Sequence, residues 1–215
     1  MSISAVVFDL DGVLVDSEQL WDSARRELVA ERGGAWRDDA THAMMGMSAP
    51  EWSHYLRDEL GVDLDPPAIS AAVIERLARL YRERLPLLPG ARAAVITASE
   101  RWPLALASSA NREIIDLVLE LADLGEYFSA SVSSEEVAHG KPAPDVYLEA
   151  ARRLGVAPTE CAAVEDSTNG LRSAAAAGMT VIAIPNQAFP PSEDALQLAT
   201  AVVPSLDELV PTLER

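Results

Sequence analysis

The chain has 215 residues, 49% hydrophobic and 24% charged, so it can bury a large core and does not have the composition of a disordered chain. Acidic residues outnumber basic ones by 34 to 17, and the formal net charge is −17. Nucleic acids and anionic membranes bind basic surfaces, so we expect neither as a partner. The single cysteine, Cys161, excludes an internal disulfide and a cysteine-rich metal site.

The expected location is cytoplasmic. The first residues carry no basic segment of the kind that opens a secretion signal. The longest uncharged stretch, residues 173–192, is broken by proline and polar residues and does not suit a membrane span. Cys161 lies in an apolar run, where a buried and unreactive thiol is expected.

In chain order, the first predicted element is a strand at residues 5–10, followed from about 17 to 87 by helix patterns without a convincing strand. Leu20, Trp21, Ala24 and Leu28 share one helix face. A capping box with proline in the first turn, residues 48–51, opens a second helix. A third amphipathic helix is predicted over 69–81.

Beyond residue 88, short apolar runs alternate with helical patterns. The runs predict strands at 104–107, 130–133, 161–164, 181–184 and 201–203, and continuous apolar strands of this kind are typical of a parallel sheet covered on both faces. Apolar residues three and four apart predict helices around 114–119, 146–154 and 171–175, and Gly155 and Gly178 lie where C-terminal caps belong.

This pattern predicts an α/β fold: a Rossmann-like parallel sheet with helices on both faces, plus an all-helical cap inserted after the first strand. The expected division is a catalytic core of residues 1–16 and 88–215 and a cap of residues 17–87.

Polar residues follow the predicted strands, where open α/β sheets bind their ligands. They are Asp9 and Asp11, then Ser108, Ser109 and Asn111, then Glu165 and Asp166, with Lys141 ahead of a helix. Asp9 and Asp11 repel each other unless a hard cation such as Mg²⁺ lies between them, and Asp166 would complete its site. The alternative is an acidic turn that caps a helix.

Ser108 and the helix that begins near Arg112 form a candidate phosphate site, with an ordinary helix cap as the alternative. Lys141, between Gly140 and Pro142, is a positioned cation or a solvated loop lysine. The sequence has no glycine-rich nucleotide loop and no Gly-x-Ser-x-Gly elbow, and its three histidines are scattered. A carboxylate is then the natural nucleophile.

Four segments together resemble the motifs of the haloacid dehalogenase superfamily, in its branch with a helical cap. They are DLDGVLVDS at 9–17, ASS at 107–109, GKPAPD at 140–145 and EDSTNG at 165–170. The resemblance covers nearly the whole chain and is strongest to the phosphatases and β-phosphoglucomutases. Dehalogenases of the family lack the second aspartate, so Asp11 argues against carbon–halogen chemistry.

The resemblance implies phosphoryl transfer in two steps, with Asp9 as the nucleophile and Asp11 as the general acid and base. It implies Mg²⁺ bound by the Asp9 carboxylate, the Asp11 backbone carbonyl and Asp166, with Glu165 supporting through water. Substrate binding is expected from Ser108, Ser109, Asn111 and Lys141. The expected partner is a small phosphorylated metabolite, such as a sugar or polyol phosphate, and the expected state is a monomer.

Two alternatives to the phosphatase stay open: a phosphomutase, and a non-catalytic sensor of a phosphorylated ligand. Mutases of this branch carry an arginine after a Gly-x-Ser in the cap, where it binds the substrate's second phosphate. Here the stretch from Gly46 to Ser48 is followed by Ala49, with Glu51 close by. This favours a monophosphate whose other end is uncharged. Trp21, Met44, Met47, Trp52 and Tyr55 either pack the cap helices together or face the substrate.

Overall fold

The computed structural model describes residues 3–44 and 47–214. Its centre is a parallel sheet of six strands in the order β3-β2-β1-β4-β5-β6, which confirms the predicted α/β fold. The strands are β1 Ala5–Phe8, β2 Leu104–Ser108, β3 Phe128–Ser133, β4 Cys161–Glu165, β5 Thr180–Ala183 and β6 Ala201–Val202. The central strands are fully buried, as their continuous apolar sequences predict.

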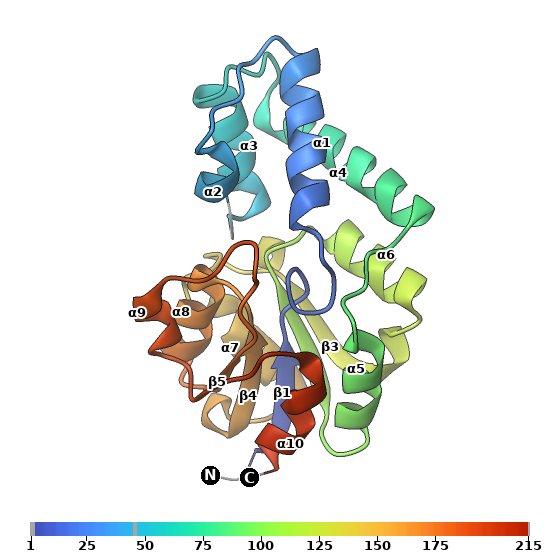
Figure 1. Cartoon of the computed structure of the whole chain (residues 1–215), viewed down its shortest axis with the longest axis vertical. Helices are drawn as coiled ribbons and strands as arrows, with labels where there is room; N and C mark the ends of the chain where they lie inside the picture. Colours follow the sequence, from blue (N-terminus) through green and yellow to red (C-terminus); the bar gives the residue numbers. More distant parts are fainter. Residues whose placement is uncertain (1–2, 45–46, 215) are drawn as a thin grey trace.

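Helices cover both faces of the sheet (Figure 1). The helices of the core are α5 Ala91–Ser99, α6 Arg112–Ala122, α7 Asp145–Leu154, α8 Thr168–Ala176, α9 Glu193–Leu196 and α10 Leu209–Leu213. Alternate residues of each strand point to opposite faces, so Val6 and Phe8 pack with α5, α6 and α10, while Val7 packs with α7 and α8.

Four helices lie beyond the sheet's carboxyl edge, and we call them the cap (Figure 1). They are α1 Glu18–Glu31, α2 Ala40–Met44, α3 Ala49–Asp58 and α4 Pro66–Glu83. The predicted capping box opens α3: the Ser48 backbone N–H donates to Glu51 Oε2 over 2.7 Å. Helix α4 packs on α1 and α3 within the cap and reaches α6 of the core.

The two chain segments that join cap and core run side by side. The backbone N–H of Asp16 donates to the carbonyl of Pro86 over 2.8 Å, and that of Leu88 donates to Leu14 over 2.9 Å. The predicted domain boundaries, after residue 16 and before residue 88, fall in these paired segments. Domain division there remains a prediction.

The structure also contains elements that the sequence patterns did not predict. Helix α5 is one, because its run of small apolar residues lacks a distinct polar face. The strand predicted at 5–10 ends at Phe8, where the chain enters a loop. Among the described helices, none is long and apolar enough to cross a bilayer.

Candidate active site

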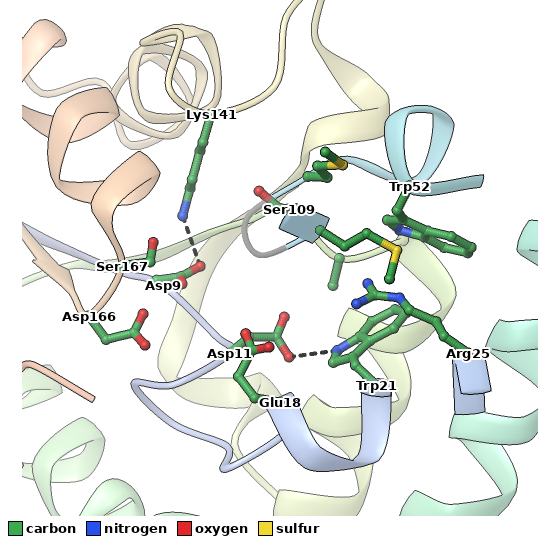
Figure 2. Close-up of a pocket in the computed structure, with 13 residues that line it drawn as sticks. Asp9, Asp11, Glu18, Trp21, Arg25, Trp52, Ser109, Lys141, Asp166 and Ser167 are labelled. Carbon is green, nitrogen blue, oxygen red and sulfur yellow. Dashed lines mark hydrogen bonds and ion pairs between the residues drawn. The ribbon is translucent and has the colours of Figure 1, made fainter. Parts of the chain in front are cut away.

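A pocket lies between the cap and the carboxyl edge of the sheet (Figure 2). Its volume is about 50 Å³. The core lines it with Asp9, Asp11, Ser109, Ala110, Lys141, Asp166 and Ser167, and the cap with Glu18, Trp21, Arg25, Met44, Met47 and Trp52. Most of the carboxylates and the lysine proposed from the sequence therefore meet at one place.

A left-handed turn at Gly12 follows the first strand and brings Asp9 and Asp11 to the same pocket. Gly12 has φ +78°, and its backbone N–H donates to the carbonyl of Val15 over 2.8 Å. A Cβ at position 12 would lie 1.9 Å from Asp166 Oδ2. Glycine therefore suits this position for two reasons: the turn has a left-handed backbone conformation, and Asp166 leaves no space for a Cβ.

Lys141 and Glu165 form a buried charge network beneath Asp9. The Lys141 ammonium donates to Asp9 Oδ1 over 2.9 Å, to Glu165 Oε1 over 2.6 Å and to the carbonyl of Ala107 over 3.1 Å. Tyr147 donates its hydroxyl to the same Glu165 oxygen over 2.7 Å. The lysine, only 4% exposed, is thus a positioned cation and not a solvated loop residue.

Glu165 is occupied by protein donors on both oxygens. Its second oxygen accepts from the backbone N–H of Asp166 over 3.0 Å and from the Ser167 hydroxyl over 3.2 Å. Glu165 is also fully buried and does not line the pocket. These contacts suit a residue that positions Lys141 and the loop after β4; support of a metal through water remains a prediction.

The pocket concentrates negative charge in a poorly hydrated place. Burial, with smaller contributions from Glu165 and Asp11, raises the pKa of Asp9 to about 8 against the opposing effect of Lys141. Burial also raises the pKa of Asp11, and burial together with Glu165 and Asp9 raises that of Asp166 well above its ordinary value. Burial and mutual repulsion are the causes expected where several carboxylates share a poorly hydrated site.

The donor set fits a hard divalent cation. Oxygens of Asp9, Glu165 and Asp166 lie within 4.8 Å of one another. Asp166 Oδ1 is buried and has no hydrogen-bond partner among the described residues, which leaves a free ligand atom aimed at this cluster. Buried oxygen-only donors of this kind are typical of Mg²⁺ and Ca²⁺ sites.

The residues expected to bind phosphate divide into two groups. Ser109 lines the pocket, and its hydroxyl is buried without a hydrogen-bond partner in the described chain. Ser108 instead accepts from the backbone N–H of Ala110 over 3.0 Å, and the Asn111 amide donates to Glu135 over 2.5 Å. The structure does not bring these two side chains to the pocket lining, so a role for them in substrate binding remains a prediction.

The cap supplies two charged pocket residues that the sequence analysis missed, Glu18 and Arg25. They lie on α1 three residues before and four residues after Trp21, so one helix face presents all three to the pocket. Trp21 also donates its indole N–H to Asp11 over 3.1 Å, beside the Ser17 hydroxyl at 2.5 Å. The helical spacing from Trp21 was the signal in the sequence that could have identified both.

The other cap residues divide between the two interpretations proposed for them, packing of the cap helices and lining of the substrate pocket. Met44, Met47 and Trp52 line the pocket, whereas Tyr55 packs into the hydrophobic core. Ala49, at the position where mutases carry arginine, is buried at the start of α3 and does not line the pocket. Gly46, the first residue of that stretch, lies outside the described residues.

Comparisons with known proteins agree with this site. The model of the haloacid dehalogenase-like hydrolases matches residues 3–178. Hexitol phosphatase B of Escherichia coli K12 is 37% identical over 195 residues, which cover 85% of this chain and 84% of that protein. A phosphorylated carbohydrates phosphatase of Thermotoga maritima is 35% identical over 179 residues, covering 82% of both chains.

A solved structure extends the likeness to the whole fold. The structure of CbbY from Rhodobacter sphaeroides in complex with phosphate superposes with a TM-score of 0.88 at 29% identity, covering 99% of this chain and 100% of that one. A family model thus matches most of the chain, and relatives more than 30% identical match it over most of their own length. The chain therefore belongs to the haloacid dehalogenase-like hydrolases, and within them it is a phosphoric monoester hydrolase.

Proposed function

We propose that this protein is a Mg²⁺-dependent phosphatase that hydrolyses a small phosphomonoester of the sugar or polyol phosphate class through an aspartyl-phosphate intermediate. The observation that carries the proposal is the pair of carboxylates in one pocket with different partners. Asp9 is paired with Lys141 at 2.9 Å, whereas Asp11 is oriented by the Ser17 hydroxyl and the Trp21 indole. Different environments suit different roles, here nucleophile and proton donor.

In the first step, a carboxylate oxygen of Asp9 attacks the phosphorus of the bound ester. The bond between phosphorus and the leaving oxygen breaks, and protonated Asp11 gives its proton to that oxygen. Burial raises the pKa of both carboxylates, and the Lys141 ammonium, 2.9 Å from Asp9, opposes this shift at the carboxylate that must be ionised to attack. Lys141, the Ser109 backbone amide and Ser108 are proposed to hold the phosphoryl oxygens.

In the second step, water attacks the phosphorus of the aspartyl-phosphate. Asp11 accepts a proton from that water, the bond between phosphorus and Asp9 breaks, and phosphate leaves, with Asp9 again a free carboxylate and Asp11 again protonated. Glu165 and Tyr147 keep the Lys141 ammonium in place throughout. Both are buried, and Glu165 accepts hydrogen bonds from the Lys141 ammonium and from the Tyr147 hydroxyl.

Mg²⁺ would be held by Asp9, Asp166 and the Asp11 backbone carbonyl, and Glu165 would support it through water. Bound there, the ion supplies positive charge that offsets the phosphoryl oxygens and the crowded carboxylates. The unpartnered Asp166 Oδ1 supports this assignment.

The substrate class rests on the relatives, whose names specify hexitol and carbohydrate phosphates. Ala49 in place of the mutase arginine favours release of phosphate over its return to a sugar. A sensor of phosphorylated ligands has no need of both Asp9 and Asp11 beside Lys141. The acidic surface and single thiol support a cytoplasmic enzyme without nucleic-acid or membrane partners.

The test is phosphate release from a panel of sugar and polyol phosphates by the wild type, Asp9→Asn and Asp16→Asn. Asp9→Asn removes the nucleophilic charge at constant shape, and we expect turnover to fall more than about 1000-fold with the fold retained. Asp16 is exposed, does not line the pocket and serves as the matched control. Turnover by Asp9→Asn within tenfold of wild type would refute the proposed nucleophile.

A second assay separates phosphatase from mutase. We expect no sustained conversion of β-glucose 1-phosphate to glucose 6-phosphate, even with a bisphosphate primer, because the cap lacks the mutase arginine. Isomerisation faster than phosphate release would establish the mutase instead.

A further inference from the structure

One cation in the pocket has no role in the steps above. Arg25, on the cap helix α1, is only 7% exposed and lines the pocket opposite the Lys141–Asp9 pair (Figure 2). Its Nε is buried without a hydrogen-bond partner, and the described residues place no carboxylate within 4 Å of its guanidinium. Buried charges are normally paired, because an uncompensated one strongly destabilises the folded state.

Two indole rings fix where this guanidinium lies. Its central carbon is 4.9 Å from the Trp21 ring centroid and 5.2 Å from that of Trp52. The two rings contact each other edge to face with centroids 6.1 Å apart. One side of Arg25 is therefore covered by aromatic carbon, and its remaining N–H groups are directed into the pocket (Figure 2).

The partners of the two pocket cations indicate what these N–H groups bind. Lys141 is already paired with Asp9 and Glu165, so among the described residues that line the pocket Arg25 is the cation left for the far end of a substrate. Burial lowers the pKa of Arg25 only to about 10, with Glu18 and Asp11 opposing the shift, so the group stays charged at neutral pH. A fixed, planar and poorly hydrated guanidinium prefers a carboxylate or phosphate, which accepts two parallel hydrogen bonds, over a single hydroxyl.

We propose that Arg25 determines specificity by binding a second anionic group, a carboxylate or a phosphate, on the leaving-group end of the substrate. This rests on the proposed phosphatase and narrows its substrates to phosphomonoesters that carry a second anionic group besides the phosphoryl group that is transferred. The sequence analysis expected a substrate whose other end is uncharged, because Ala49 stands at the start of α3 where mutases carry arginine. The structure instead provides an arginine at the pocket from α1, on the same helix face as Trp21.

Matched substrates test the proposal. Glycerol phosphate and 3-phosphoglycerate differ at C1, hydroxymethyl in one and carboxylate in the other, as do glucitol 6-phosphate and 6-phosphogluconate. Fructose 6-phosphate and fructose 1,6-bisphosphate test phosphate as the second anion. In one or more pairs, we expect wild-type kcat/KM to be at least tenfold higher for the substrate with the second anionic group, mainly through a lower KM. Equal or higher kcat/KM for the substrate without that group in every pair would overturn the proposal.

Variants assign the preference to Arg25. Arg25→Met keeps much of the side-chain volume. It should lower kcat/KM about 100-fold for the preferred substrate with a second anionic group, but less than threefold for the matched substrate without that group. Arg25→Lys should recover part of the loss, since it restores the charge without the planar fork. Arg26→Met is the control, because the Arg26 side chain is half-exposed and paired with Asp22. Equal losses on both substrates of a pair would mean that Arg25 is merely structural.

A binding measurement keeps this test independent of turnover. Calorimetric titration of Asp9→Asn, with and without Arg25→Met, should show tighter binding of the anionic member only when Arg25 is present. Proper folding of each variant is checked by its melting temperature. If p-nitrophenyl phosphate is hydrolysed in an Asp9-dependent way but no anionic preference exists, the specificity proposal fails alone; if wild type hydrolyses no ester while the binding preference holds, the proposed phosphatase fails alone.

Discussion

Gly12 shows how one residue shapes the active site. Along a straight strand, side chains two residues apart share a face, but Asp9 lies at the end of β1 and Asp11 in the loop beyond it. The left-handed turn at Gly12 follows directly, and its missing Cβ leaves space for Asp166 beside the backbone. The glycine thus connects the first and fourth motifs of the family.

We therefore expect Gly12→Ala to damage the site beyond its cost in backbone conformation. Alanine at φ +78° costs about 1–2 kcal/mol, and its Cβ would also displace the Asp166 carboxylate. Gly33→Ala is the matched control, because Gly33 has φ +73° and open space around the missing Cβ. Urea unfolding should show comparable destabilisation, while phosphate release should fall more than tenfold only for Gly12→Ala. Equal activity of the two variants would contradict this.

At the scale of elements, an ion-pair network fastens the end of β3 to two helices. Glu136, just after β3, accepts from Arg112 of α6 and from Arg153 of α7, the latter at 2.7 Å. Neighbouring Glu135 accepts from Asn111 at the start of α6. The network therefore holds the segment after β3 against the start of α6, which directly follows the loop that carries Ser109.

This network makes stability depend on pH. Partial burial alone would raise the pKa of Glu136, but hydrogen bonds from Arg112 and Arg153 lower it from 4.5 to about 2. Below pH 4.5 the unfolded chain takes up this proton first, so the stabilisation is complete above pH 4.5 and is lost as the pH falls toward 2.

Glu136→Gln should accordingly lower the free energy of unfolding by about 1 kcal/mol at pH 7, a modest amount because the pair is partly exposed to solvent. The difference from wild type should shrink between pH 4.5 and pH 2 in urea titrations. Glu126→Gln, at an exposed site outside the network, is the control. A difference that stayed constant with pH would show that Glu136 acts through packing and not through its charge.

At the scale of the whole molecule, the site exists only where cap and core meet. Seven of the pocket residues come from the core and six from the cap helices and the chain between them. Asp9 and Asp166 are buried beneath the cap, and burial strengthens charge interactions in the pocket. The same burial raises the pKa of Asp9, Asp11 and Asp166, so binding a cation should stabilise the fold.

We expect phosphate release to require Mg²⁺, to stop with excess chelator and to be inhibited by Ca²⁺, which takes more ligands in looser geometry. Mg²⁺ should raise the melting temperature of the wild type but not that of Asp166→Asn, which lacks one carboxylate of the cluster. Full activity in chelator, in protein free of bound metal, would contradict the metal site.

The sequence by itself determined the class of fold and most of the charged groups of the candidate active site. Short runs such as residues 161–164 are apolar at every position, which is typical of a strand buried on both faces. Parallel strands align their carboxyl ends, so Asp9, Lys141 and Asp166 were predicted to meet without knowledge of any distance. Ser48 and Glu51 likewise marked the start of α3, because a capping box is a local interaction.

Only the tertiary structure decided the rest, because it depends on contacts between residues far apart in the chain. Ser108 and Asn111 were expected in the pocket, but their nearest partners turned out to be a backbone amide and Glu135. Arg25 looked like any arginine on an amphipathic helix until folding placed it against two indoles and removed it from water. Local patterns report propensity and periodicity, whereas burial and the pairing of charges are properties of the assembled molecule.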